Sequence, residues 1–140
     1  MDYEIKTAQG LGSLPYAAEI RKRVFMEEQG FKNEFDDIDE KAVHALLFCD
    51  GAPAATGRLY SENGSFHIGR VAVLKEYRGK ALGSMIISAL EAEAKKMGAL
   101  CISLSAQTQA QGFYEKLGYV SENDLHMDEF CPHVTMTKVL

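Results

Sequence analysis

The chain has 140 residues, of which 46% are hydrophobic and 25% are charged, and its formal net charge is −5. This length is enough to bury one sizeable core but not two, so we expect a single domain over residues 1–140. The acidic balance leaves no broad basic face, which argues against a nucleic-acid partner.

The cysteines and the first residues predict the compartment of the protein. Cys49, Cys101 and Cys131 are an odd number at wide spacing, with no Cys-x-x-Cys pair and no clustered histidines. This pattern predicts reduced, mostly buried thiols rather than a disulfide framework or a metal site. The stretch MDYEIKTAQG has no features of a secretory signal, and no segment reaches the length needed to cross a bilayer. We expect a cytoplasmic protein with no membrane partner.

The first half of the chain predicts four strands and one helix. Alternating apolar and polar residues indicate a strand near the N-terminus, and Ser13 and Pro15 indicate the start of a helix. Asp50-Gly51 and Asn63-Gly64 are turn signals between antiparallel strands. The predicted strands cover residues 3–7, 42–48, 54–60 and 66–74.

A cluster of acidic residues separates the predicted helix from the second strand. From Glu27 to Glu40 there are seven acids and one base, Lys32, which gives a local charge of −6. A free charge of this size would attract cationic molecules, and a solubilising acidic loop is the alternative interpretation.

The stretch IGRVAVLKEYRGKALGS, residues 68–84, is the most informative part of the sequence. An apolar strand runs directly into a basic, glycine-containing turn that opens a helix. Backbone N–H groups at a helix start have no intrahelical partner, so they and the flanking charges would hold a phosphate or pyrophosphate. An ordinary connection with solvated basic residues is the alternative. The turn comprises Arg78, Gly79, Lys80, Ala81, Leu82, Gly83 and Ser84.

The second half of the chain predicts a crossover and a C-terminal antiparallel pair. The helix over residues 81–97 ends at Gly98, and the next strand, 100–104, must lie parallel to 66–74 because the helix between them is a right-handed crossover. A short helix is expected at 109–117. Residues 119–120 and 133–139 are then expected to pair.

Two motifs carry a resemblance to a known family. Arg78, Ala81 and Gly83 follow the strand RVAV with the spacing of motif A of the GNAT superfamily of acyl-CoA N-acyltransferases, and the stretch AQTQAQGFYEKLGY resembles its motif B. Gln107 stands where many members have asparagine. The segments RKRVFMEEQGFKNEFDDID and DEFCPHVTM resemble the ElaA-like subgroup of small bacterial GNAT proteins. The resemblance therefore covers nearly the whole chain.

The resemblance implies a fold and a donor substrate. The fold is α+β with three layers: a mixed, mostly antiparallel sheet, a splayed parallel pair formed by the fourth and fifth strands, and helices on both faces. The donor is acetyl-CoA, with no metal, and a homodimer is compatible with the family. The implied coenzyme A contacts are Val71, Ala72, Val73, Arg78, Gly79, Lys80, Ala81, Leu82, Gly83, Ser84, Gln107 and Tyr114. Gly69 fits a bulge that would open the cleft, or a merely weak strand position.

The implied reaction transfers an acetyl group from the thioester directly to a primary amine of a small molecule or peptide. Tyr114 matches the position whose hydroxyl protonates the thiolate, and the backbone N–H near Val71 would polarise the carbonyl. The base is open among Glu28, Asp36, His67 and His133, with His133 and Glu28 as the first candidates.

Two other functions remain open at this point. The chain could be a non-catalytic acyl-CoA-binding or sensing domain that kept the cofactor cleft, or a nucleotide-phosphate binder that uses the same turn. The acceptor itself is not predicted, because acceptor pockets are built from loops and from the tail.

Overall fold

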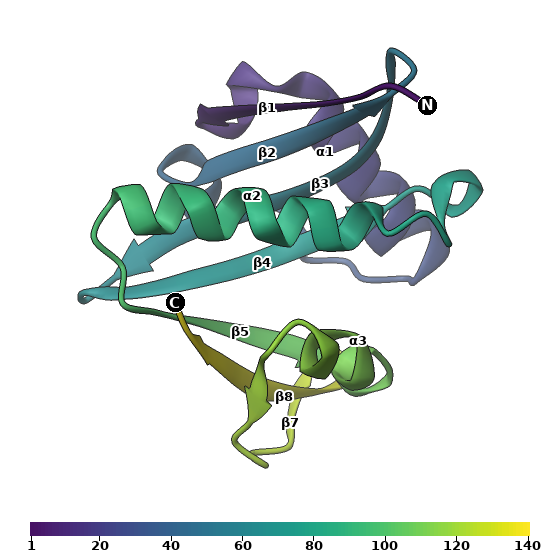
Figure 1. Ribbon diagram of the computed structural model, residues 1–140. Coiled ribbons are helices and arrows are strands. Elements are labelled where there is room, and N and C mark those ends of the chain that lie inside the picture. Colours follow the sequence, from purple (N-terminus) through teal and green to yellow (C-terminus); the bar gives the residue numbers. More distant parts are fainter.

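The computed structural model describes residues 1–140 and is built on one eight-stranded sheet (Figure 1). The strand order is β1-β2-β3-β4-β5-β8-β6, with β7 paired to β8, and only β4 and β5 run parallel. This confirms the predicted mixed, mostly antiparallel sheet. The strands are β1 (Tyr3–Gln9), β2 (Val43–Cys49), β3 (Ala52–Glu62), β4 (Ser65–Val73), β5 (Cys101–Gln107), β6 (Val120–Ser121), β7 (His126–Asp128) and β8 (Cys131–Val139).

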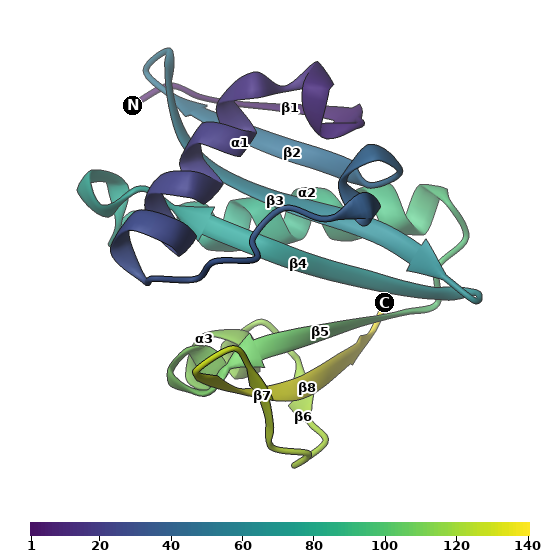
Figure 2. The same ribbon diagram turned by 180° about the vertical axis from the view of Figure 1, so that it is seen from behind.

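Helices cover both faces of the sheet, as predicted (Figures 1 and 2). Helix α2 (Leu82–Lys96) lies across one face. Helix α1 (Pro15–Arg21) lies across the other and continues as a π-helical segment, η2 (Lys22–Glu28). The third helix, α3 (Gln111–Lys116), is shorter than expected because the residues before it form a 3-10 turn, η5 (Thr108–Ala110). None of the helices has the length and apolar character that crossing a membrane requires.

The two faces of the sheet carry separate hydrophobic cores. The larger packs Leu82, Ile86 and Leu90 of α2 against the sheet, and the smaller packs Ile20 and Val24 of α1 and η2 against the opposite face. Burial of these stripes follows from their helical spacing. The cores fix the two segments that border the candidate site, the start of α2 and the end of η2.

Gly57 of β3 allows α2 to lie close to the sheet. A Cβ atom at this position would lie 2.7 Å from Cγ2 of Ile86 and 3.0 Å from Cδ1 of Leu90. The contact with Ile86 is shorter than real Cβ atoms make, so a side chain here would force Ile86, or α2 with it, to shift. The absence of a side chain at Gly57 therefore sets the height of α2 above β3.

The parallel pair is splayed, as the resemblance implies. β4 and β5 pair only at His67 and Ser103, and their ribbons part toward α3 (Figure 1). Beyond this pair, the edge of β4 over Val71–Val73 faces β5 without pairing to it. The sheet is thereby opened between β4 and β5.

Strand β4 has a β-bulge in its pairing with β3, at the point where β4 and β5 separate. Arg58 of β3 pairs with Gly69 and Thr56 pairs with Ala72, so two residues of β4 stand opposite one residue of β3. The expected bulge is present, but its left-handed residue is Arg70, with φ +52°, rather than Gly69. Bulges re-aim side chains and increase local twist, which favours the separation of the strands.

Candidate active site

The turn between β4 and α2 opens one end of a groove. Gly79 and Ala81 both have left-handed backbone, with φ +83° and +61°. Ala81 is the N-cap residue and has no side chain able to cap, while the first bond of the helix runs from the Met85 N–H to the Ala81 carbonyl. The N–H groups that precede Met85 in α2 lack helical partners and can bind an anion.

The groove has a volume of about 490 Å³ and follows the unpaired edge of β4. Most of the residues expected to contact coenzyme A line it. Lys80 and Ser84 lie outside this wall, and Gln107 lines the neighbouring pocket instead. The expected residues in the wall are Val71, Ala72, Val73, Arg78, Gly79, Ala81, Leu82, Gly83 and Tyr114.

Arg78 is fixed at the mouth of the groove by two partners. Its Nε donates to the Val73 carbonyl at 3.0 Å, and its two Nη atoms donate to the Glu28 carboxylate at 2.6 and 2.7 Å. The hydrogen bonds from Arg78 hold the pKa of Glu28 below its usual value. Glu28 therefore lies at the turn and is paired there.

A central pocket of about 210 Å³ adjoins the groove. Both cavities are lined by Tyr114, Val71, Gln29 and Ala110. The Tyr114 hydroxyl has no hydrogen-bond partner in the protein, and burial raises the pKa of Tyr114 to about 12. Tyr114 therefore stands between the two cavities as a neutral donor.

His133, at the start of β8, lines the central pocket. Its Nδ1 lies 2.9 Å from the Cys131 carbonyl, which can only accept a hydrogen bond, so we assign the proton to Nδ1. In the neutral ring Nε2 then carries the lone pair, and no protein group donates to it. This is the tautomer that a base in the pocket needs.

A third cavity, the outer pocket, adjoins the central one and has a volume of about 260 Å³. The two share Gly69, Arg70 and Ser105, together with Ile68, Leu104, Asp128 and His133. Here His67 stacks on Tyr60, with ring centroids 5.1 Å apart. The groove, the central pocket and the outer pocket form one path through the opening between β4 and β5.

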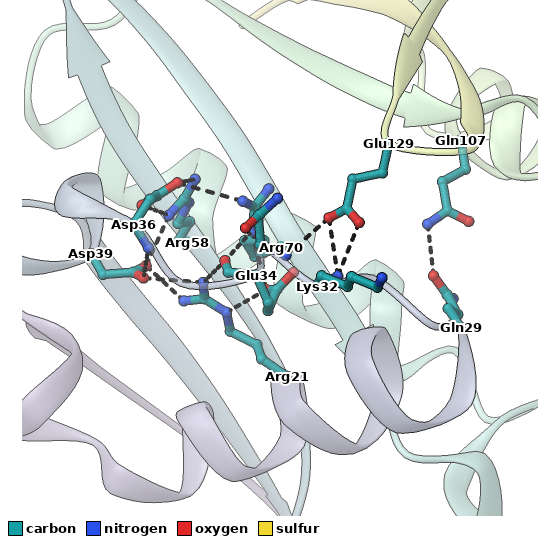
Figure 3. Close-up of polar contacts among 11 residues, drawn as sticks. Arg21, Gln29, Lys32, Glu34, Asp36, Asp39, Arg58, Arg70, Gln107 and Glu129 are labelled. Atoms are coloured by element: carbon teal, nitrogen blue, oxygen red, sulfur yellow. Dashed lines mark hydrogen bonds and ion pairs between the residues drawn. The ribbon is translucent and has the colours of Figure 1, made fainter.

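Three arginines and three carboxylates form a cluster beside this path (Figure 3). We call Arg21, Arg58, Arg70, Glu34, Asp36 and Asp39 the ionic cluster. Its closest contacts join Arg21 Nη1 to Asp39 Oδ1 at 2.7 Å, and Arg58 Nη1 to Asp36 Oδ1 at 2.7 Å. Arg21 and Arg58 come from α1 and β3, so the cluster fixes the acidic segment on the sheet.

Protonation in the cluster follows from burial and pairing together. Burial opposes the charged form of Asp39, but hydrogen bonds from Arg21 and Arg58 and from the Asp36 N–H lower the pKa of Asp39 to about 2. For Glu34 burial prevails and raises its pKa, although Arg70 and Arg21 act in the opposite direction. With Glu28 bound to Arg78, four of the seven acids in this segment are neutralised by arginines. The prediction of a freely charged segment is wrong for these four.

Two bridges connect the acidic segment to the far side of the opening (Figure 3). Gln107 donates to Gln29 Oε1 at 2.8 Å. The Glu129 carboxylate accepts from the N–H groups of Lys32 and Asn33, at 2.9 to 3.1 Å. Phe31 stacks on Phe130 beside them, with ring centroids 5.0 Å apart. Of these residues, Gln29, Phe31 and Gln107 line the central pocket, and the contacts of Glu129 and Phe130 support that wall from outside the lining.

Sequence reasoning missed several residues of the path. Gln29, Phe31, Arg70 and Asp128 all line it. Only Arg70 left a signal, because it follows the strand glycine that suggested a bulge. The other three depend on contacts between segments distant in the sequence.

The splayed pair and the turn at α2 define this as a GNAT fold. The chain belongs to the acetyltransferase (GNAT) domain family, whose model matches residues 8–140. The Bacillus subtilis protein YyaT is 38% identical over 96% of this chain and 94% of its own. A Pseudomonas aeruginosa acyl-CoA N-acyltransferase structure has a TM-score of 0.82 and 27% identity, covering 99% of both chains. The structure of Escherichia coli ElaA has a TM-score of 0.85 and 23% identity, covering 98% of this chain and 99% of its own, which agrees with the ElaA-like features of the sequence.

Proposed function

We propose that this protein transfers an acetyl group from acetyl-CoA to the primary amine of an acceptor held in the central pocket. The observation that carries the proposal is the position of Tyr114, which lines both the groove and the central pocket. A thioester that reaches from the groove would meet the acceptor at this junction.

The donor would lie along the groove. Its pyrophosphate would bind the free N–H groups at the start of α2, and its pantetheine arm would follow the edge of β4 over Val71–Val73. An N–H group near Val71 would stabilise the oxygen of the tetrahedral intermediate. Gln107 would contact the arm at its junction with the central pocket.

The acceptor would enter as an ammonium ion and lose one proton to Nε2 of His133. The neutral nitrogen then attacks the thioester carbon, the C–N bond forms and the C–S bond breaks. The thiolate takes the proton of the Tyr114 hydroxyl, and the proton released by the nitrogen on amide formation restores Tyr114. Glu28 is the weaker candidate for the base because Arg78 engages both of its oxygens.

An acceptor screen with acetyl-CoA, followed by free thiol, tests the proposal. Tyr114→Phe is expected to lower kcat by about 100-fold or more and to leave the Kd of coenzyme A nearly unchanged, because only the acidic proton is removed. Tyr16→Phe is the matched control, since Tyr16 is exposed and does not line the groove or either pocket. Coenzyme A binding without thiol release for any acceptor would favour a sensing domain. Unchanged turnover in Tyr114→Phe would remove Tyr114 from the mechanism.

A further inference from the structure

We infer that the acceptor is a small amine that also carries an anionic group, a carboxylate or a phosphate, and that Arg70 binds this group in the outer pocket. The inference rests on the proposed function for the reaction and adds the chemical class of the acceptor. Four features of the outer pocket support it.

The first feature is the charge of the wall. Arg58 and Arg70 line the outer pocket, and Asp128 is the only carboxylate among its 12 lining residues. The three acids of the ionic cluster are not part of this wall. The outer pocket is therefore bordered by the guanidinium side of the cluster.

The second feature is that Arg70 has hydrogen-bond donors to spare. Its Nε donates to Glu34, with 3.1 Å to the carbonyl and 3.1 Å to the carboxylate, and its Nη2 lies 3.4 Å from the Asp36 carboxylate. Its Nη1 has no acceptor in the protein, and 24% of the side chain is exposed. A guanidinium held at Nε and Nη2 keeps the two N–H donors of Nη1 free, and these can bind an oxygen of a carboxylate or phosphate.

The third feature is an unsatisfied donor next to Arg70. Arg58 is 3% exposed, and its Nε has no hydrogen-bond partner, although its guanidinium lies over the Tyr60 ring at 5.3 Å. Buried donors without a partner are uncommon in folded proteins. Arg58 is held rigidly by Asp36 and Asp39, and it adds one unpaired, buried N–H donor beside Arg70.

The fourth feature is the backbone of Arg70. A φ of +52° is unfavourable for a residue with a side chain, and such residues persist where the surrounding structure enforces them, often at ligand sites. Here the bulge places Arg70 in the walls of both the central and the outer pocket. Glycine would relieve the strain but would remove the cation.

The opposite end of the acceptor also has matching groups. His133 and Asp128 line both pockets, and the carboxylate of Asp128 has no cationic partner in the protein. An ammonium ion near these two groups and an anion at Arg70 would complement the charged and polar groups that the two pockets share. The volumes of about 210 and 260 Å³ are suited to a small molecule.

Matched acceptors test the inference. The panel consists of the protein amino acids, β-alanine and 4-aminobutyrate, each compared with its carboxamide, and of O-phosphoethanolamine compared with ethanolamine. KM is measured from thiol release with acetyl-CoA, and Kd from calorimetric titration of the protein saturated with coenzyme A. We expect at least one anionic amine to bind about 10- to 100-fold more tightly than the counterpart that lacks the anionic group. If a carboxylate pair shows this difference, the anion is a carboxylate, and if the O-phosphoethanolamine pair shows it, the anion is a phosphate.

Variants assign the effect to Arg70. Arg70→Gln is expected to abolish the preference for the anionic amine, and Arg70→Lys to keep part of it, because lysine retains the charge but not the fork. Arg23→Gln is the matched control, because Arg23 pairs with Glu76 away from the path. Equal binding of each anionic amine and its uncharged counterpart by the unmodified protein overturns the inference without recourse to any variant. A preference that persists in Arg70→Gln also overturns it.

The two proposals fail in different ways. Binding of an anionic amine that depends on Arg70, without thiol release, would overturn the transferase reaction and support the ligand class. Thiol release that is equally efficient with each anionic amine and its uncharged counterpart, in the unmodified protein and in Arg70→Gln alike, would do the reverse. Neither binding nor turnover for any amine of the panel would overturn both.

Discussion

At the scale of single residues, hydrogen bonds determine which groups are free to react. Glu28 and His133 are both first candidates for the base, but Glu28 is held by Arg78 while Nε2 of His133 is unengaged. Tyr114 has no partner for its hydroxyl, and its pKa of about 12 keeps it protonated across the neutral range. These differences support the proposal that His133 accepts a proton and that Tyr114 donates one.

The assignment of His133 predicts a change in the pH profile. His133→Asn keeps a donor for the Cys131 carbonyl but removes the base, so kcat/KM at neutral pH is expected to fall by about 100-fold or more. Because the remaining activity requires an amine that is already neutral, it should rise with pH up to the pKa of the acceptor amine. Steady-state kinetics from pH 6 to pH 10 would show this rise. A variant with the pH profile of the unmodified protein would exclude His133 as the base.

At the scale of elements, the ionic cluster holds the acidic segment on the sheet. Arg21 and Arg58 are nearly fully buried, and they share the Asp39 carboxylate. Removal of one partner from a buried ion pair leaves an uncompensated charge, which is strongly destabilising. The stability of the pocket wall should thus depend on Asp39.

Asp39→Asn tests this dependence. We expect a loss of about 3 to 5 kcal/mol in the free energy of unfolding, measured by urea denaturation at pH 7. The pKa of Asp39 is lowered from 3.8 to about 2, so its stabilisation is complete above about pH 4 and is lost as the pH falls toward 2. The unmodified protein should therefore lose stability over this range more steeply than the variant. Parallel curves for the two proteins would contradict the role of Asp39.

The β7–β8 hairpin is the second element that borders the pocket. Its connection carries Glu129, which holds the N–H groups of Lys32 and Asn33. Glu129→Gln is expected to accelerate hydrogen exchange at these two amides and to raise the KM of the acceptor several-fold, since the wall is loosened while the reacting groups remain. Glu122→Gln is a suitable control because the Glu122 side chain makes no hydrogen bond. Exchange rates that match the control would show that Glu129 does not hold the wall.

At the scale of the whole molecule, the site lies between the part of the sheet that ends at β4 and the part that begins at β5. Only the short β4–β5 pairing joins these two parts. A coenzyme A molecule in the groove would contact the β4 and α2 side and the α3 side together, through Gly83 and Phe113 among others. Ligand binding should therefore stabilise the complete fold and not the turn alone.

Thermal unfolding in the presence of ligands measures this effect. At 100 times its Kd, coenzyme A is expected to add roughly 2.7 kcal/mol to the free energy of unfolding, and to raise Tm accordingly. ATP shares the phosphates but lacks the pantetheine arm, so its effect at equal concentration should be smaller. Stronger protection by ATP than by coenzyme A would overturn the acyltransferase proposal in favour of a nucleotide binder.

The sequence predicted those parts of the fold that depend on local signals. Asp50-Gly51 and Asn63-Gly64 located two turns, and the crossover rule gave the parallel direction of β5. Strand β7 was missed because its three residues are too few for a periodic pattern. The family motifs led to the turn at Arg78 and to Tyr114, both of which line the groove.

The rest of the site depends on contacts that no local pattern encodes. Arg21, Arg58 and Arg70 lie on three elements, and their pairing with the acidic segment emerges only when the sheet brings these elements together. The strand glycine indicated a bulge, but the backbone strain falls on Arg70 because two residues of β4 must oppose one of β3. Electrostatic pairing at long sequence distance was thus the main feature that the sequence left open.

Gly57 links the position of α2 to the bulge in β4. It lies under α2 on one side, and it faces the bulged residues of β4 along the sheet. A methyl group there would press on Ile86 and Leu90 of α2, and a shift of α2 would move the N–H groups proposed to bind the pyrophosphate. If the donor binds as proposed, the absence of a side chain at Gly57 sets the distance between the N–H groups that would hold its pyrophosphate and the edge of β4 that would hold its pantetheine arm.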